Sequence, residues 1–179
     1  MMNIPATLPE NNAAPAAARR LPIWALVAIA LLALGAYANS LQNSFALDDV
    51  AIVQGNSSVK DLEWLRIWTE NYWPKQDGVE PDILYRPLTM WSYLAANALV
   101  PGAAWPHHLG NILLHALVTV MVTLLAWRIV GNRGIALLTG FLFALHPLHT
   151  EVVADIVGRA EVLSTAFSLA ALLVFLAAS

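Results

Sequence analysis

The feature that most constrains this 179-residue chain is a series of long, nearly uncharged apolar stretches. A membrane-spanning helix needs about 20 mostly apolar residues. Four stretches approach or reach that length: residues 21–41, 109–130, 135–148 (the shortest) and 161–179. The sequence therefore predicts an all-α, polytopic membrane protein with about four transmembrane helices.

Composition supports this fold class and excludes several others. Hydrophobic residues make up 59% of the chain and charged residues 12%, whereas a soluble domain carries about 25% charged residues. The net charge of −3 argues against a nucleic-acid partner, which needs a basic face. The absence of cysteine excludes thiol catalysis and thiolate metal sites. A membrane protein remains.

The distribution of basic residues predicts the orientation. A cytoplasmic N-terminus places Arg19, Arg20, Arg128 and Arg133 inside and every acidic residue except Glu10 outside, as the positive-inside rule requires. Residues 1–20 are then a disordered cytoplasmic N-terminus and 131–134 a cytoplasmic turn. We expect a multi-pass protein of the bacterial inner membrane, or of the endoplasmic reticulum if the source is eukaryotic. A cleaved signal peptide is the alternative for 21–41, but this stretch exceeds the usual apolar region of such peptides.

The long outer loop, residues 42–108, is predicted to carry two amphipathic helices that lie along the membrane surface. They cover residues 59–73 and 84–100 and are joined by the polar stretch 75–82. A span at 84–100 is the alternative. It would bury Arg86 and move Arg128 and Arg133 to the outside, so the surface helix is preferred.

Residues 149–160 are predicted to extend the last span outward as outer loop or helix. A continuous helix from Thr150 to Ala178 would be about 43 Å long, against a hydrocarbon core of about 30 Å. It would project Glu151, Asp155 and Arg159 from one face toward the outer loop. An ion pair between Asp155 and Arg159 is the purely structural alternative.

Ionisable groups from three distant stretches converge on the outer surface, where they are functional candidates. Asp48 and Asp49 suit a general base or a divalent cation, or else a helix cap. Arg86 suits a phosphate, or else a pairing with Asp82. The other candidate site residues at this surface are Tyr85, His146, His149, Glu151 and Glu161.

Histidine residues give two weaker signals. His146, His149 and Glu151 have a spacing that suits a metal, although capping of a helix end is commoner. Asn111 and His115 lie one turn apart within the second span, with His107 and His108 just before it. For these, hydrogen bonding between helices is a more probable role than catalysis.

The order of these motifs resembles one family. Phe45-x-x-Asp48-Asp49 is followed by Tyr85-Arg86-Pro87-Leu88, by the 108–116 stretch HLGNILLHA, and by ALHPLHTE at 144–151 running on to Gly158-Arg159-Ala160-Glu161. This order is similar to the N-terminal membrane part of the transmembrane and tetratricopeptide-repeat O-mannosyltransferases, which are GT-C glycosyltransferases. The resemblance covers residues 42–175.

The resemblance implies transfer of a sugar from a polyprenyl-phosphate carrier to an acceptor protein or glycan on the non-cytoplasmic face. It assigns the base to Asp48 or Asp49, with Asp49 preferred, and the donor phosphate to Arg86 and Arg159. Tyr85, His146, His149, Glu151 and Glu161 then shape the substrate pocket.

Family members have more spans and a repeat array, so the chain is expected to be either a fragment of a longer protein or a truncated, inactive protein. The alternative function is a non-catalytic membrane anchor. A transporter is disfavoured because the charges cluster outside the membrane rather than at its middle.

Overall fold

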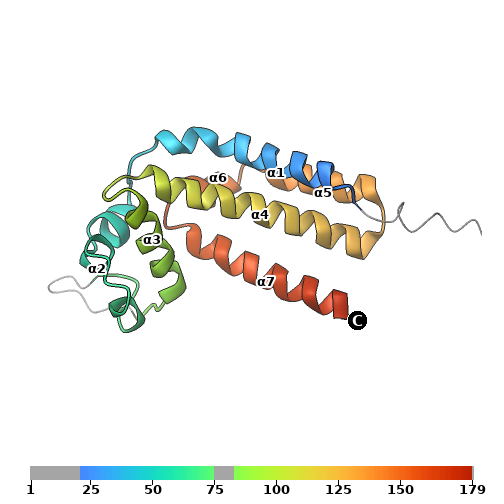
Figure 1. Ribbon diagram of the computed structural model, residues 1–179. Coiled ribbons are helices and arrows are strands. Elements are labelled where there is room, and N and C mark those ends of the chain that lie inside the picture. Colours follow the sequence, from blue (N-terminus) through green and yellow to red (C-terminus); the bar gives the residue numbers. More distant parts are fainter. Residues whose placement is uncertain (1–20, 75–82, 179) are drawn as a thin grey trace, which may run out of the picture.

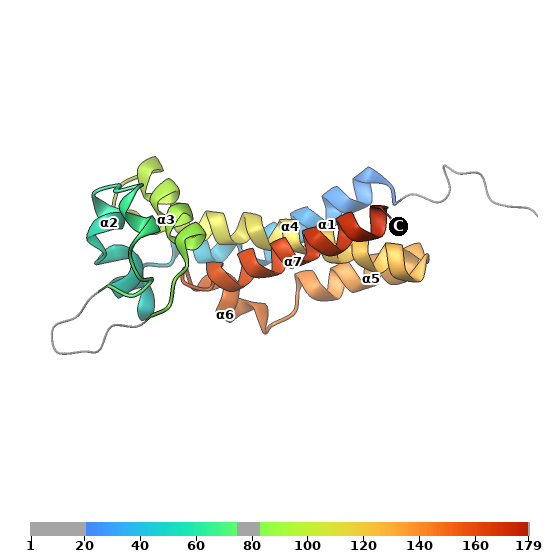
Figure 2. The same cartoon turned by 90° about the horizontal axis from the view of Figure 1, so that it is seen from below.

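The computed structural model describes residues 21–74 and 83–178, and its regular elements within these ranges are all helices. Four helices form an elongated bundle (Figures 1 and 2): α1 (Ile23–Tyr37), α4 (Trp105–Val130), α5 (Arg133–Ala144) and α7 (Arg159–Ala178). The short α2 (Ser57–Lys60) and the longer α3 (Pro87–Leu99) gather at one end of it, and α6 (His149–Ala154) precedes α7. The all-α prediction is confirmed for the described residues.

Within the described ranges, three segments are long and apolar enough to cross a membrane: Ile23–Gln42, Trp105–Val130 and Arg159–Ala178. The third predicted span, 135–148, is shorter than expected, because α5 ends at Ala144 after 12 residues. Pro147 follows closely, and a proline disfavours helical conformation in the residue before it. The span at 109–130 begins earlier than expected, at Trp105, with Pro106 in the first turn, where proline is well tolerated.

A tight turn joins α4 to α5. Gly131 adopts a left-handed conformation with φ of 68°, which glycine reaches without steric cost. The Asn132 side chain then accepts a hydrogen bond from the Ile135 amide at 3.1 Å and caps α5. The turn lies where the sequence predicts it, and α5 runs back along α4 (Figure 1).

Small residues bring α1, α4 and α5 together. Ala33, Ala116 and Ala144 form a buried cluster between these helices. Gly140 of α5 faces Thr123 of α4 so closely that a Cβ atom would collide with the threonine hydroxyl. Such residues let membrane helices approach and gain packing contacts that bulky side chains would prevent.

One end of the molecule, made of residues 43–74, residues 83–104 and the α6–α7 turn, has a hydrophobic core of its own. We call it the outer end, after the orientation predicted from the sequence. The buried members of this core are Ile52, Val53, Val59, Ile67, Tyr72, Met90, Tyr93, Leu94 and Ile156. This core explains why one of the two predicted surface helices is absent.

The predicted helix over 59–73 is wrong, whereas the one over 84–100 is present as α3. In the first segment α2 ends at Lys60, Leu62 takes a φ of 54°, and a 3₁₀ turn follows at Arg66–Trp68. The breaks let Val59, Ile67 and Tyr72 all turn into the core. The predicted connection 75–82 lies outside the described residues, as do residues 1–20.

The predicted continuous helix from Thr150 is also wrong. α6 ends at Ala154, Asp155 is extended, and α7 begins at Arg159. Gly158 lies against the Val152 backbone, and a Cβ atom on it would collide with the Val152 carbonyl. Glu151, Asp155 and Arg159 therefore do not share one helical face.

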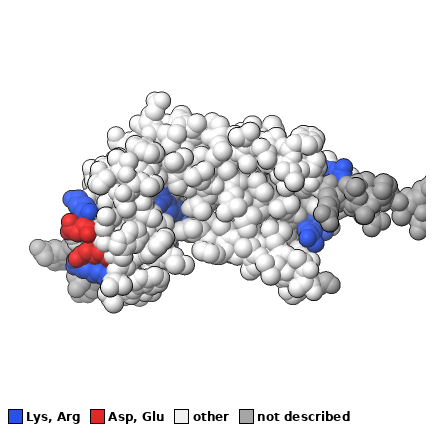
Figure 3. All heavy atoms as spheres, viewed as in Figure 1, with Lys and Arg blue, Asp and Glu red and all other residues white. Residues whose placement is uncertain are grey.

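Charge follows the long axis of the molecule. Figure 3 shows acidic and basic side chains at the end formed by α2 and α3, basic side chains at the opposite end, and an almost uncharged middle. This arrangement fits a bundle that crosses a bilayer with its acidic residues on one side.

Candidate functional site

The acidic pair after α1 is split between two environments. The Asp49 side chain is 1% exposed, whereas Asp48 is exposed. One Asp49 carboxylate oxygen accepts a hydrogen bond from the Val157 amide at 2.9 Å, and the other accepts one from the Ala46 amide at 3.4 Å. Burial raises the pKa of Asp49 above its usual range. Asp49 therefore ties the loop after α1 to the α6–α7 turn.

Arg159 is the central internal cation of the outer end. Its side chain is 2% exposed. Its Nε donates to Asn111 Oδ1 at 2.7 Å, one terminal nitrogen donates to the Ser92 carbonyl at 3.0 Å, and the other donates to the His107 carbonyl. The guanidinium also lies 4.9 Å from the centre of the Tyr93 ring.

These contacts differ from those expected for Arg159. Its partners are neutral groups of α3 and α4, so the ion pair with Asp155 considered from the sequence does not form. Gly110 makes room for it on α4, because a Cβ atom there would lie 2.9 Å from the guanidinium. Arg159 lines none of the cavities described below.

Four of the predicted site residues line one cavity of about 420 Å³, which we call the acidic cavity. They are Asp48, Arg86, Glu151 and Glu161, and Asp155 joins them. Burial raises the pKa of Asp155, and the neighbouring carboxylates of Asp48 and Glu151 raise it further. The cavity therefore gathers four carboxylates around a single guanidinium.

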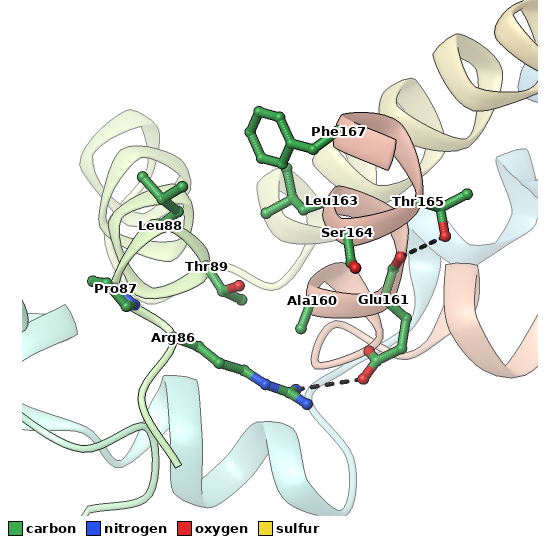
Figure 4. A pocket seen from close by; sticks show the side chains of 10 residues that line it. All are labelled: Arg86, Pro87, Leu88, Thr89, Ala160, Glu161, Leu163, Ser164, Thr165 and Phe167. Carbon is green, nitrogen blue, oxygen red and sulfur yellow. Dashed lines mark hydrogen bonds and ion pairs between the residues drawn. The ribbon is translucent and has the colours of Figure 1, made fainter. Parts of the chain in front are cut away.

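A second space, the apolar groove, runs between α3 and α7 and has a volume of about 590 Å³. Figure 4 shows Leu88 on one wall and Leu163 and Phe167 on the other, with Arg86 reaching across toward Glu161. The Arg86 guanidinium lies 3.4 Å from the Glu161 carboxylate. Both residues also line the acidic cavity, so this ion pair marks the border between the two spaces.

Tyr72 holds Arg86 from the other side. The guanidinium lies 5.1 Å from the centre of the Tyr72 ring, a cation–π distance. The Tyr72 hydroxyl in turn lies 3.1 Å from the Tyr93 hydroxyl, deep in the outer core. The alternative partner Asp82 lies outside the described residues.

The other predicted residues lie outside both spaces. The Tyr85 hydroxyl donates to the Trp68 carbonyl at 2.7 Å. The His146 carbonyl accepts from the Tyr37 hydroxyl at 3.0 Å, and His149 Nδ1 lies 2.9 Å from the Phe143 carbonyl. These contacts fasten the α5–α6 connection to its neighbours. Among the described residues no group of three or more histidine, aspartate or glutamate side chains is arranged to hold a metal ion.

The predicted hydrogen bonding to neighbouring elements is confirmed for Asn111 and His115 of α4, but not for His107 and His108. The Asn111 side chain donates to the Asp155 carbonyl at 2.7 Å, and a ring nitrogen of His115 lies 3.3 Å from the Ala144 carbonyl. Asn111 thereby fixes both the α6–α7 turn and Arg159.

Sequence reasoning missed Tyr72 and Trp73 as walls of the acidic cavity. Both lie in an aromatic-rich stretch that its helical spacing predicts to be a surface helix. Only the tertiary fold brings the Tyr72 ring against Arg86 and places Trp73 in the wall of the same cavity. Asp155 carried a weak signal, since its charge lies four residues from both Glu151 and Arg159.

Comparison with known proteins identifies relatives by sequence. The chain is 34% identical over 149 residues to the protein O-mannosyl-transferase TMTC2 of Mus musculus, covering 81% of this chain and 18% of that protein. It is 39% identical over 143 residues to TMTC1 of Homo sapiens, covering 76% and 16%. It is 36% identical over 135 residues to Tmtc2 of Drosophila melanogaster, covering 73% and 14%.

The chain thus spans less than a fifth of the length of these relatives. No protein-family model matches it. No solved structure matches it either.

Proposed function

This chain is homologous to the TMTC protein O-mannosyl-transferases, and from that relationship we propose that it forms the donor-binding end of a membrane glycosyltransferase. The enzyme transfers a sugar from a polyprenyl-phosphate carrier to hydroxyl groups of a protein on the non-cytoplasmic face. The alternative is a non-catalytic membrane anchor with the same fold.

The observation that carries this proposal is the position of Arg86 between the acidic cavity and the apolar groove. A polyprenyl-phosphate sugar has a matching order of parts: an apolar tail, an anionic phosphate and a polar sugar. The tail fits the groove between α3 and α7, and the phosphate fits the guanidinium of Arg86, which can bind two phosphate oxygens at once. The carboxylates of Glu151 and Asp155 suit the sugar hydroxyls, which donate hydrogen bonds to them.

Asp48 is the better general base of the acidic pair. A base must reach the hydroxyl from which it takes a proton, and Asp48 is exposed and lines the acidic cavity. Asp49 has both oxygens occupied by backbone amides, so we assign it the role of positioning Asp48. This reverses the preference that the resemblance suggests.

In the reaction, the acceptor oxygen attacks the anomeric carbon while Asp48 takes the hydroxyl proton. The bond between that carbon and the phosphate oxygen breaks, and the polyprenyl phosphate leaves with the bonding electrons. Arg86 stabilises the negative charge that grows on the leaving phosphate. Arg159 binds neither substrate and instead holds the start of α7, and with it Glu161, in place.

The test is a transfer assay on membranes that contain the full-length protein, with radiolabelled polyprenyl-phosphate mannose and a protein acceptor. We expect Asp48→Asn to lower kcat by at least about 100-fold, the usual contribution of a general base. We expect Arg86→Gln to raise the donor KM by about tenfold to 100-fold, with a smaller effect for Arg86→Lys. Asp61→Asn is the matched control, because Asp61 is exposed and lies outside both spaces.

Full activity of Asp48→Asn at equal protein level would refute the base assignment. Failure of the wild-type protein to transfer from any polyprenyl-phosphate sugar would favour the anchor instead. Loss of activity in Asp49→Asn together with a lowered unfolding temperature is the pattern expected for a positioning residue.

A further inference from the structure

We propose that a second polar cavity in the outer end, which shares Trp73 with the acidic cavity, binds the acceptor polypeptide. This inference deepens the proposed function and rests on it for the identity of the acceptor. The cavity has a volume of about 570 Å³, and its wall includes Asn56, Arg66, Thr69, Glu70, Asn71 and Trp73. We call it the outer cavity.

Arg66 and Glu70, the two charged residues in the wall of the outer cavity, form an ion pair and neutralise each other. Arg66 Nε lies 2.5 Å from one carboxylate oxygen of Glu70, and the other oxygen of Glu70 accepts from the Ser58 hydroxyl at 2.5 Å. A second carboxylate, that of Glu63, lies 2.6 Å from the Arg66 guanidinium. A phosphate would have to displace two carboxylates at 2.5 and 2.6 Å from Arg66, whereas Arg86 has a single carboxylate partner at 3.4 Å, so this wall favours an uncharged ligand.

The rest of the wall offers the groups that a peptide backbone uses. The Asn71 side-chain amide can donate and accept hydrogen bonds, and Trp73 contributes an aromatic surface. The Thr69 hydroxyl donates to the Arg66 carbonyl at 3.0 Å and can still accept, and the Asn56 side-chain oxygen accepts from the Ser58 amide at 2.9 Å, which leaves its NH2 group to donate. An extended peptide with small polar side chains has alternating backbone donors and acceptors to match these groups. A lipid tail has neither.

Trp73 connects this cavity to the chemistry, because it lines both the outer cavity and the acidic cavity. An extended chain advances about 3.3 Å per residue. Two or three residues therefore carry a peptide past one indole ring. A segment held in the outer cavity can thus present a neighbouring serine or threonine hydroxyl to Asp48.

The experiment measures peptide binding separately from transfer. Purified full-length protein in lipid nanodiscs, without donor, is titrated against a short fluorescein-labelled peptide rich in threonine and alanine, and anisotropy is recorded. We expect Asn71→Leu and Thr69→Val to weaken binding by about tenfold, the effect of losing one or two hydrogen bonds. Asn39→Leu is the matched control, because Asn39 is exposed and lies outside the cavities described here.

The same variants are then assayed for transfer. We expect the KM for the peptide to rise by the same factor in Asn71→Leu and Thr69→Val, while the KM for the donor and kcat stay constant. Arg86→Gln should show the reverse pattern, with donor KM raised and peptide affinity unchanged. Size-exclusion profiles and unfolding temperatures check that each variant is folded.

Three results would overturn the inference: no binding of the peptide by wild type, unchanged binding by both folded variants, or displacement of the peptide by a soluble oligomannose. The last result would assign the outer cavity to a glycan. Failure of the proposed function looks different, because the wild type would then bind the peptide without transferring sugar to it.

Discussion

Removal of the Asn111 side chain should destabilise the protein far more than removal of an equally buried asparagine elsewhere. Asn111 accepts from Arg159 Nε at 2.7 Å and donates to the Asp155 carbonyl at 2.7 Å. In Asn111→Ala the buried Arg159 Nε loses its acceptor, and the carbonyls of the half-buried Asp155 and the buried Ile156 lose their donor. A buried neutral group left unpaired costs about 1 kcal/mol at the low end and a charged one about 3 kcal/mol, so we expect a loss of about 4 kcal/mol.

Asn97 of α3 supplies the comparison. It is 6% exposed, donates to the Val59 carbonyl at 2.9 Å and accepts from the Gly102 amide at 2.9 Å. Both partners are neutral, so Asn97→Ala should cost about 2 kcal/mol. The difference between the two losses in unfolding free energy therefore measures the cost of leaving the buried guanidinium of Arg159 without one of its hydrogen-bond acceptors.

The assay is unfolding followed by tryptophan fluorescence, with both variants in the same detergent. At about 2–4 °C per kcal/mol for a chain of this size, Asn111→Ala should lower the Tm by about 8–16 °C and Asn97→Ala by about 4–8 °C. Equal losses in the two variants would refute the reasoning, because they would mean that Arg159 finds water or another acceptor once Asn111 is gone.

Three further predictions concern the close approaches and the buried acid. Gly110→Ala places a methyl group against the Arg159 guanidinium, so it should cost about 1–3 kcal/mol in the same unfolding assay. Gly35→Ala in α1 is the control and should not destabilise the protein, because a Cβ atom there meets nothing within 4 Å. Gly158→Ala brings a Cβ atom onto the Val152 carbonyl, so transfer activity and the unfolding temperature should both fall. A variant with full activity and an unchanged unfolding temperature would show that the backbone can move apart at this turn. Because burial raises the pKa of Asp49, the folded state binds a proton more readily than the unfolded state, and stability relative to Asp49→Asn should rise as the pH falls from neutrality toward the usual aspartate pKa of about 3.9. A difference between the two thermal unfolding curves that does not change with pH would contradict this.

The apolar spans and the gathering of acidic residues at one end of the bundle could be predicted because they depend on local composition and on charge bias alone. α1, α4 and α7 follow from 20-residue apolar stretches, and the α4–α5 turn follows from Gly131 and Asn132. The outer end could not be predicted in the same way. Apolar residues do recur at helical spacing in residues 59–73. Val59, Ile67 and Tyr72 nevertheless pack in one core from separate short turns rather than from one continuous helix.

The membership of the candidate site was predictable only in part, because four of the nine predicted residues line the acidic cavity. The charge of Arg86 at the start of α3, and of Glu161 at the start of α7, pointed to the surface where they meet. The sequence treats Arg86 and Arg159 alike, whereas the fold buries one and leaves the other at the border of two spaces. Likewise, adjacent carboxylates look equivalent until the Val157 amide binds Asp49 and leaves Asp48 free to face the acidic cavity.

The anchoring of Arg159 also bears on how the protein tolerates membranes of different thickness. α7 is 20 residues long, or about 30 Å, and its far end is loosely held, with Val174 and Phe175 each 68% exposed. Transmembrane helices adjust to bilayer thickness by tilting. A tilt of about 5° with Arg159 as the pivot moves that far end by about 2.6 Å but Glu161, about 3 Å from the pivot, by only about 0.3 Å. A change in bilayer thickness that tilts α7 thus hardly changes the distance between Glu161 and Arg86.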